Sequence, residues 1–328
     1  NGEHPEYHID SKTEVLCISL PQTKVNQNII INISHVGKIT DDMAGIYPCY
    51  FEHNGIKKWI IATQLESHYA RQVFPCIDEP EAKATFDLTL ITDKKHTALS
   101  NMTVASSQAI DDTNRIKTVF NTTPRMSTYL LAFATGEMHY RTSKTKDGVT
   151  VTSWASVVQP AENLEYSVNE AVKTIEFFNE YFDTPYPLEK CDQVALPDFD
   201  AGAMENWGLI TYRESAMLDD HINPSISSRQ YISTVIAHEL SHQWFGNLVT
   251  MKWWDDLWLN ESFASLMEYI AVDALHPEWQ AWEDYTAADV VSASNRDVFS
   301  DVQPVRIGVN DPAEITTLFD GAIVYAKG

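Results

Sequence analysis

The chain has 328 residues, of which 44% are hydrophobic, and a chain of this size and composition can form two globular domains with sizeable cores. Its 46 acidic and 23 basic side chains give a formal net charge of −23. Such an excess of negative charge argues against nucleic acid and against anionic membrane surfaces as partners. Most of it is expected on solvated faces, while a minority can make a cleft attractive to a cation such as a peptide's amino end.

The four cysteines, at positions 17, 49, 76 and 191, are widely scattered and include no C-x-x-C pair. They therefore predict neither a disulfide framework nor a zinc cluster, and reduced thiols fit a cytoplasmic protein. No apolar run is long enough to cross a membrane, and no signal peptide is recognisable. The chain begins with Asn1 rather than methionine, so the sequence is compatible with a preceding segment. It does not define the oligomeric state.

Residues 1–139 are expected to form an N-terminal β domain, an antiparallel sandwich or saddle. This part contains short β-forming runs between clusters of turn residues and has no long helical period. Gln64 and Glu66 follow one of these runs, and their own pattern indicates no more than a polar loop. The expected strands are residues 15–20, 29–33, 58–62, 85–91 and 126–133.

A polar and basic stretch at residues 141–148 marks the expected domain boundary, which we place between residues 139 and 140. Residues 149–155 then predict a strand. Residues 162–182 predict a helix, because apolar side chains recur there at a spacing of three and four. The remainder of the chain, residues 140–328, is expected to form a second domain.

Residues 202–206, Gly-Ala-Met-Glu-Asn, follow a short apolar run that ends at Pro197. The small residues Gly202 and Ala203 let another backbone approach closely, so a strand edge at this point could pair with an extended peptide. Glu205 would then offer a carboxylate at the end of that peptide. A loop glutamate beside a glycine explains the same residues, and the pattern alone does not decide between the two.

The most informative stretch is His238-Glu239-Leu240-Ser241-His242, an H-E-x-x-H pattern in a helical context. Two histidines four residues apart lie on one face of a helix, so both imidazoles can bind the same ion. Ser227 and Ser228 are predicted as N-caps and Gly246-Asn247 as the stop. Taken alone, so short a pattern also occurs by chance on solvated helices.

Glu261 is the best placed third metal ligand. It follows His242 after eighteen intervening residues and stands in the first turn of a second helix that can pack back onto the first. Zinc accepts neutral histidine nitrogen and carboxylate oxygen, and a catalytic zinc keeps one position open for water. Glu239 can reach that water. We therefore predict one Zn²⁺ per chain, held by His238, His242 and Glu261.

Towards the end of the chain, residues 277–302 predict a polar helix with no obvious chemistry. Residues 319–328 form an apolar stretch of helical pattern that contains Tyr325. A tyrosine in such a stretch usually belongs to the core, and its own surroundings indicate no catalytic role.

Taken together, the motifs resemble those of the gluzincin aminopeptidases of the aminopeptidase N type. Several separated motifs in the right order are far more specific than any one of them, and here they cover most of the chain. They are residues 74–80 (Phe-Pro-Cys-Ile-Asp-Glu-Pro), 202–206, 238–247 and 258–261 (Trp-Leu-Asn-Glu).

The resemblance implies an α+β protein in which the β-sandwich or saddle domain, without its first strands, precedes a thermolysin-like and mainly helical zinc domain. It also implies that the zinc domain is truncated at its C-terminus, because family members continue well beyond the segment of Tyr325. Activity of this chain then depends on whether the missing region is needed.

The same resemblance assigns roles to residues whose own pattern is silent. It implies that Glu66 and Glu205 bind the α-amino group of a peptide and that Gln64 lines the pocket for its first side chain. It also implies that Tyr325 points at the scissile carbonyl. The implied substrate-binding motif also includes Gly202, Ala203, Met204 and Asn206.

The implied reaction removes N-terminal amino acids, preferably neutral or basic ones, from peptides with a free N-terminus. Glu239 is the general base and Tyr325 a donor to the oxyanion. Three alternatives use the same residues. A leukotriene-type epoxide hydrolase is disfavoured by Ala203, because that branch resembles Gly-Gly-Met-Glu-Asn, and a thermolysin-type endopeptidase has no need of Glu66 and Glu205. An inactive fragment or a non-catalytic peptide-binding module is favoured by the truncated end and disfavoured by the intact Glu239.

Overall fold

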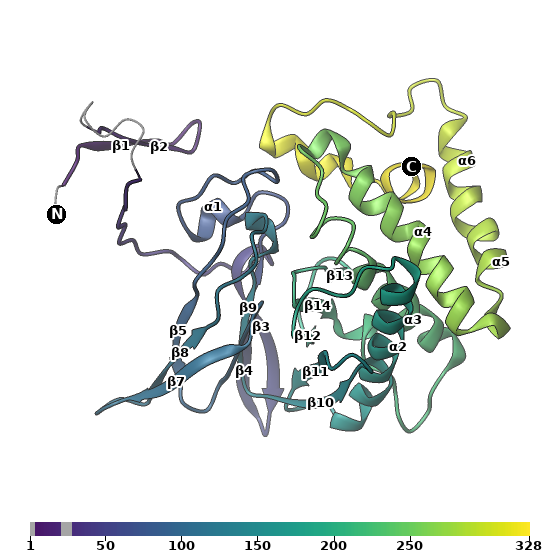
Figure 1. Cartoon of the computed structure of the whole chain (residues 1–328), viewed down its shortest axis with the longest axis horizontal. Helices are drawn as coiled ribbons and strands as arrows, with labels where there is room; N and C mark the ends of the chain where they lie inside the picture. The colour runs from purple at the N-terminus through teal and green to yellow at the C-terminus, as the bar shows by residue number, and fades with distance from the viewer. Residues whose placement is uncertain (1–3, 21–27) are drawn as a thin grey trace.

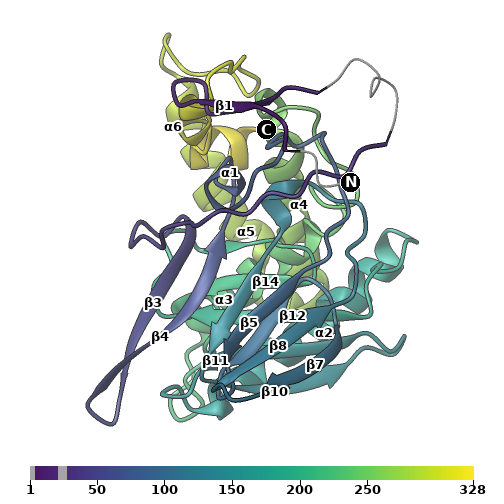
Figure 2. The ribbon, with the colours of Figure 1, turned by 90° about the vertical axis from the view of Figure 1, so that its left-hand side faces the viewer.

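The computed structural model describes residues 4–20 and 28–328 and shows a mixed α+β protein, as predicted. Antiparallel β-sheets come first in the chain, and a region of helices around one further sheet follows. In Figure 1 the N-terminal sheets lie on the left, the second sheet in the middle and the helices on the right. After a turn of 90°, the N-terminal strands lie in front of the helical region, so they cover one side of it (Figure 2).

The N-terminal region contains three antiparallel sheets in the described residues. The first is a hairpin of β1 (Tyr7–Asp10) and β2 (Val15–Ile18). The second has the order β3-β4-β9-β6 and consists of β3 (Gly45–His53), β4 (Ile56–Gln64), β9 (Phe133–Gly136) and β6 (Thr97–Ser100). The third has the order β5-β8-β7 and consists of β5 (Thr89–Asp93), β8 (Arg115–Phe120) and β7 (Val104–Ile110). A single helical turn, α1 (Ala70–Val73), follows β4.

Two of the predicted strands are wrong, and a third, at residues 85–91, begins only at Thr89. Residues 29–33 have the composition of a strand, but none of the described strands pairs with them, and Ile30 is 90% exposed. β-propensity describes a fit to a half-buried sheet and is not sufficient without a partner.

Residues 126–133 do not form the predicted strand but pass through a 3-10 turn at Thr128–Leu130. The Asn101 side chain takes the place of a neighbouring strand, because its Nδ2 donates to Leu130 O at 2.7 Å and its Oδ1 accepts from Ala132 N at 2.9 Å. The apolar composition of this run therefore reflects burial on all sides rather than membership of a sheet.

The second region is built on a five-stranded sheet of order β10-β11-β12-β14-β13. Its three central strands are parallel and its two outer strands antiparallel to their neighbours. Helix α2 (Glu165–Tyr181) packs on β10 and β11, and α3 (Ile226–Ser241) lies between α2 and α4 (Trp258–Leu275). The strands are β10 (Met138–Lys144), β11 (Thr150–Ser156), β12 (Lys190–Leu196), β14 (Leu209–Arg213) and β13 (Ala203–Met204).

The predicted strand at 149–155 and helix at 162–182 are confirmed by β11 and α2. The chain passes from the N-terminal sheets to the five-stranded sheet between Gly136, the end of β9, and Met138, the start of β10. The boundary at 139/140 lies just inside β10, and the division into domains stays a prediction.

The last part of the described chain is helical. It runs through α5 (Ala281–Tyr285), a π-helical turn (Thr286–Val290), α6 (Val291–Asp297), a 3-10 helix (Pro312–Leu318) and a second π-helical segment (Gly321–Lys327). This agrees with the helical patterns predicted at 277–302 and 319–328. None of the helices in the described residues combines the length and the apolarity needed to span a membrane.

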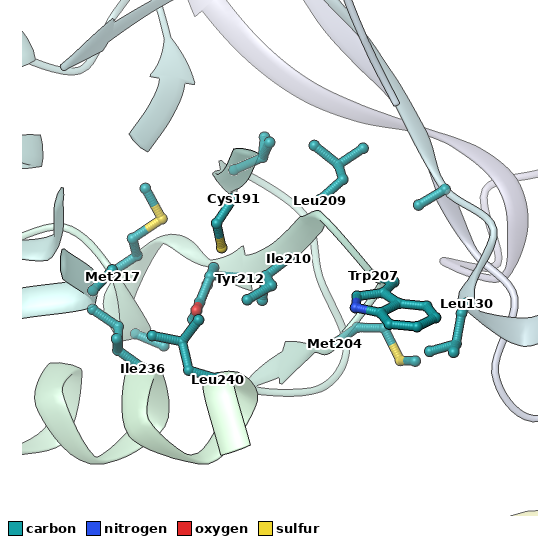
Figure 3. Packing of buried hydrophobic residues seen from close by; sticks show 14 of the residues in the cluster. Leu130, Cys191, Met204, Trp207, Leu209, Ile210, Tyr212, Met217, Ile236 and Leu240 are labelled. Atoms are coloured by element: carbon teal, nitrogen blue, oxygen red, sulfur yellow. The ribbon is translucent and has the colours of Figure 1, made fainter. Parts of the chain in front are cut away.

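The core of the second region fixes α3 on the sheet. Cys191 of β12 and Tyr212 of β14 face Ile236 and Leu240 of α3, and all four side chains are buried (Figure 3). Burial of side chains of this size stabilises the packing by about 1.5–3 kcal/mol for each large apolar group. The apolar face of α3 is thereby turned to the sheet, which leaves a different face of the helix for chemistry.

Polar contacts join the N-terminal region to the second region beside residues 202–208. Lys190 Nζ donates to the backbone oxygens of Ser100 and Gly208 and to Asp192 Oδ2, each at 2.7 Å. Asn101 Nδ2 also donates to Trp207 O at 2.9 Å. Because the lysine is almost fully buried and uses all three of its N–H groups, this seam holds the two regions in one relative position.

Gly208 lies in this seam with a φ of +79°, and a Cβ added there would overlap the backbone oxygen of Asn101. We expect Gly208→Ala to lower the free energy of unfolding by about 2–4 kcal/mol, from the left-handed backbone and the clash together. Gly148 is the matched control, because its φ is +93° but its Cβ would meet open space. Gly148→Ala should cost about 1 kcal/mol in the same urea unfolding experiment. Equal losses of unfolding free energy in the two variants would mean that a Cβ at position 208 does not disturb the contact between the two regions.

Candidate active site

The H-E-x-x-H segment lies at the C-terminal end of α3, where His242 is the C-cap, but the ends of this helix differ from the prediction. The N-cap is Ser225, whose Oγ accepts from Ser228 N at 3.1 Å, and not Ser227 or Ser228. The helix ends at Ser241, about one turn before the expected stop at Gly246. An unwound turn follows, in which Gly246 adopts a φ of +124°.

Three atoms that can bind a metal meet between α3 and α4. His238 Nε2 and His242 Nε2 lie 3.1 Å apart, and Glu261 Oε2 lies 3.3 Å from the first and 3.4 Å from the second. Glu261 stands in the first turn of α4, as predicted. Ligand atoms at about 2.0–2.2 Å around a tetrahedral zinc lie roughly 3.3–3.5 Å from one another, so the observed spacing suits such an ion.

The Nδ1 atoms of both histidines form hydrogen bonds that orient the lone pairs of their Nε2 atoms toward each other. His242 Nδ1 lies 2.9 Å from the carbonyl of Phe245 and must carry the hydrogen, because a carbonyl can only accept. His238 Nδ1 donates to Glu268 Oε2 at 2.6 Å. Two facing lone pairs repel each other unless a cation lies between them, and outer bonds of this kind are typical of histidines that bind metals. The donor set therefore fits a metal ion.

Glu268 is a site residue that the sequence analysis missed. It stands on α4 seven residues after Glu261, which is two helical turns, so both carboxylates project from one face of the helix. That spacing was the available signal, but the short pattern around Glu261 did not suggest extending the search along α4.

Removing the carboxylate of Glu268 is expected to weaken zinc binding. Loss of such an outer partner typically costs about 10–100-fold in metal affinity, so Glu268→Ala should lie near the upper figure and Glu268→Gln, which still accepts from His238, near the lower. Competition with a chromogenic chelator measures the zinc dissociation constant. Glu283→Gln on the exposed side of α5 is the control, and an unchanged constant in Glu268→Ala would show that Glu268 does not support the metal site.

Three further carboxylates lie near the ligand atoms, those of Glu205 and Glu239 buried and that of Glu66 half-buried. Glu66, Glu205 and Glu239 each have a buried oxygen with no hydrogen-bond partner among the described residues. Burial raises the pKa of Glu239 to about 8, although His238 opposes the shift. The pKa of Glu66 is raised well above its usual range by burial first and then by the carboxylates of Glu205, Glu261 and Glu239.

The pKa of Glu261 is shifted in the opposite direction. Its burial favours the protonated form, but the two histidines, when they are protonated, outweigh that effect and lower its pKa to about 2. So many acids in one low-dielectric space repel each other and favour the binding of positive charge. A metal ion at the histidines and an ammonium group near Glu66 and Glu205 would supply that charge.

Among the other predicted residues, Tyr325 contacts a histidine of this centre. The ring of Tyr325 stacks on His238 with centroids 6.0 Å apart. Gln64, at the end of β4, has a buried side-chain oxygen for which the described residues offer no hydrogen-bond partner. Asn206 Nδ2 donates to Thr211 Oγ1 at 3.3 Å. Met204 is 1% exposed and packs beside Trp207 and Leu130, within the core (Figure 3).

Gly202 and Ala203 lie at the outer edge of the five-stranded sheet, because β13 is its edge strand. Ala203 pairs with Tyr212 of β14 on one side. In the described residues β13 has no second neighbouring strand. The roles of all these residues in binding and catalysis stay predictions.

A second residue that sequence reasoning missed is Tyr129 of the N-terminal region. Its hydroxyl donates to Gly246 O at 3.4 Å and accepts from Asn260 Nδ2 at 3.2 Å. It is fully buried and so reaches both the turn after His242 and the turn that carries Glu261. It stands between Thr128 and Leu130 in a run without a recognisable motif, so only the tertiary contacts reveal it.

An H-E-x-x-H helix whose histidines meet a glutamate from the next helix defines a zinc-metalloprotease type of site. Sequence comparison places the chain within this class. Residues 4–130 match the Peptidase M1 N-terminal domain and residues 166–328 the Peptidase family M1 domain. The chain therefore belongs to peptidase family M1, as the motifs predicted.

Relatives in this family carry aminopeptidase names. The chain is 52% identical over its whole length to aminopeptidase N of Lactococcus lactis subsp. lactis and 48% identical to aminopeptidase N of Lactobacillus helveticus, and it covers 38% of each. It is 45% identical, over 98% of its residues, to a puromycin-sensitive aminopeptidase of Caenorhabditis elegans and covers 34% of that protein. The chain thus spans little more than a third of the length of the relatives it matches.

Proposed function

We propose that this chain carries the active site of a zinc-dependent aminopeptidase, which removes N-terminal residues from peptides. One Zn²⁺ would be held by His238, His242 and Glu261. The observation that carries the proposal is that two further carboxylates near this site, Glu66 and Glu205, each have a buried oxygen without a hydrogen-bond partner in the described part of the chain. Buried charges without partners are costly, so an ammonium group that pairs with them is the simplest reason for their presence.

Each group of the chain has a distinct task in this proposal. When bound, zinc polarises the scissile carbonyl and lowers the pKa of water. Glu239 takes the proton of the attacking water and returns it to the leaving amine. Its buried Oε2 has no hydrogen-bond partner among residues 4–20 and 28–328. Tyr325 donates its hydroxyl hydrogen to the carbonyl oxygen as negative charge develops there.

The substrate is positioned by the anchors and by the sheet edge. Glu66 and Glu205 bind the α-ammonium, which places the first peptide bond over the metal ligands and leaves no room for residues before it. The free edge at Ala203 can hydrogen-bond to an extended peptide. The expected partners are therefore peptides with a free N-terminus.

The test is hydrolysis of alanyl, leucyl and arginyl chromogenic amides, with the zinc content measured on the same sample. Turnover that a chelator abolishes and added zinc restores is the expected result. Bound zinc without turnover would contradict an enzymatic function of this chain and leave a peptide-binding module. Absence of bound zinc at micromolar free metal would contradict the proposed ligand set.

A further inference from the structure

Glu205 follows the last paired residue of the edge strand β13, so its backbone lies outside the hydrogen-bond ladder of the sheet. Strand β13 is only two residues long, and its register with β14 ends at the pair Met204–Thr211. Glu205 is the next residue. Its carbonyl must therefore find a hydrogen-bond donor outside the sheet ladder, because the residue is 3% exposed.

Two side-chain amides from the segment after α3 supply these donors. Asn247 Nδ2 donates to Glu205 O at 2.9 Å, and Gln243 Nε2 donates to the same oxygen at 3.3 Å. Gln243 Nε2 also donates to Glu239 O at 2.9 Å. Both amide side chains are fully buried, and their amino groups must face the carbonyls, since the reverse orientation would bring oxygen against oxygen.

The same two residues are tied to the metal ligands. The backbone N–H of Asn247 donates to His242 O at 3.0 Å, and Gln243 is the residue that follows His242. Asn247 thus bonds to a metal-binding residue through its backbone and to Glu205 through its side chain. The distance between the metal site and the carboxylate of Glu205 is set through these short connections.

We infer that Asn247 and Gln243 are positioning residues, which hold Glu205 at the separation from the metal that an α-amino ligand requires. The inference rests on the proposed function, since it assumes that Glu205 binds the ammonium group. Displacement of a charged group by even half an ångström weakens a bidentate or charge-assisted contact, while contacts made only to the metal are unaffected.

A pair of ligands separates this role from a merely structural one. Leucine hydroxamate carries a metal-binding group and an α-amino group, and 4-methylpentanoyl hydroxamate is the same molecule without the amino group. In the zinc-loaded chain, the ratio of their dissociation constants by calorimetry reports the recognition of the ammonium alone. A variant that only loosens the fold or the metal site weakens both ligands equally and leaves the ratio unchanged.

We expect Asn247→Ala and Gln243→Met each to reduce the preference for the amino ligand about fivefold, and the double variant by at least tenfold, with binding of the other ligand unchanged. Gln243→Met keeps the length of the side chain, and it provides the test by itself if Asn247→Ala does not fold. Leu248→Ala, at an exposed neighbouring position, is the control and should keep the wild-type ratio.

Other outcomes overturn different statements. A clear preference in the wild type that both variants retain would overturn the inference and leave the proposed function standing. No preference in the wild type would overturn the assignment of Glu205 as an amino anchor, and the inference with it. A crystal structure of Asn247→Ala with the Glu205 backbone in place would overturn the inference irrespective of the binding data.

Discussion

Replacing Glu239 with glutamine is expected to leave zinc bound and to lower kcat for aminoacyl amides by about 10²–10⁴-fold. The substitution keeps the size of the side chain and alters none of the three ligand atoms. It removes the group that accepts a proton, and an amide cannot take over that task. Metal analysis and steady-state kinetics on the same preparation measure both parts of the prediction.

The control for this substitution is Glu180→Gln on the exposed side of α2, which should keep wild-type kcat and zinc content. A zinc-replete Glu239→Gln protein with wild-type kcat would refute the role of general base. Loss of zinc in Glu239→Gln would instead show that Glu239 supports the metal, a result that the geometry of the three ligand atoms does not lead us to expect.

The second large effect is expected from the amino anchors. Glu66→Gln and Glu205→Gln should each lower kcat/KM for substrates with a free amino end by about 10–100-fold, because each removes one charge-assisted contact to the ammonium group. Burial raises the pKa of both acids, so loss of either charge also relieves an unfavourable interaction in the free protein. We therefore expect the thermal midpoint of both variants to be no lower than that of the wild type.

This combination of lower activity and undiminished stability distinguishes an anchor from a structural carboxylate. Peptides with an acetylated N-terminus provide the comparison, since the wild type should cleave them poorly and the variants should lose no further activity on them. Equal cleavage of acetylated and free peptides by the wild type would indicate an endopeptidase. A lower midpoint in Glu66→Gln would show that this carboxylate holds the fold together.

The two proposed anchors come from different parts of the chain. Glu66 follows β4 of the N-terminal region, and Glu205 follows β13 of the second region. Their separation depends on the seam around Lys190, whose three hydrogen bonds join Ser100, Asp192 and Gly208. Destabilising this seam, as in Gly208→Ala, is expected to affect substrate binding before it affects the metal, because the three proposed ligands all lie on α3, its C-cap His242 and α4.

Local spacing in the sequence was sufficient to predict the cluster of His238, His242 and Glu261. His238 and His242 are one helical turn apart, and Glu261 opens the next helix, so their meeting needs only two adjacent helices packed side by side. The same kind of reasoning located β11 and α2. It was wrong at residues 29–33 and 126–133, where apolar composition was taken for a strand without knowledge of a pairing partner.

The sequence by itself thus determined the family, the α+β class and the cluster of His238, His242 and Glu261, because these depend on periodicity and on motifs a few residues long. Only the tertiary structure showed the hydrogen bonds of Glu268 to His238 and of Asn247 to the backbone of Glu205. It also showed that Tyr129 contacts the turn after His242 and the first turn of α4. Tyr129 and Asn247 act on segments many residues away in the chain. Their contacts arise from the way the sheets and helices pack, and packing leaves no periodic trace in the sequence.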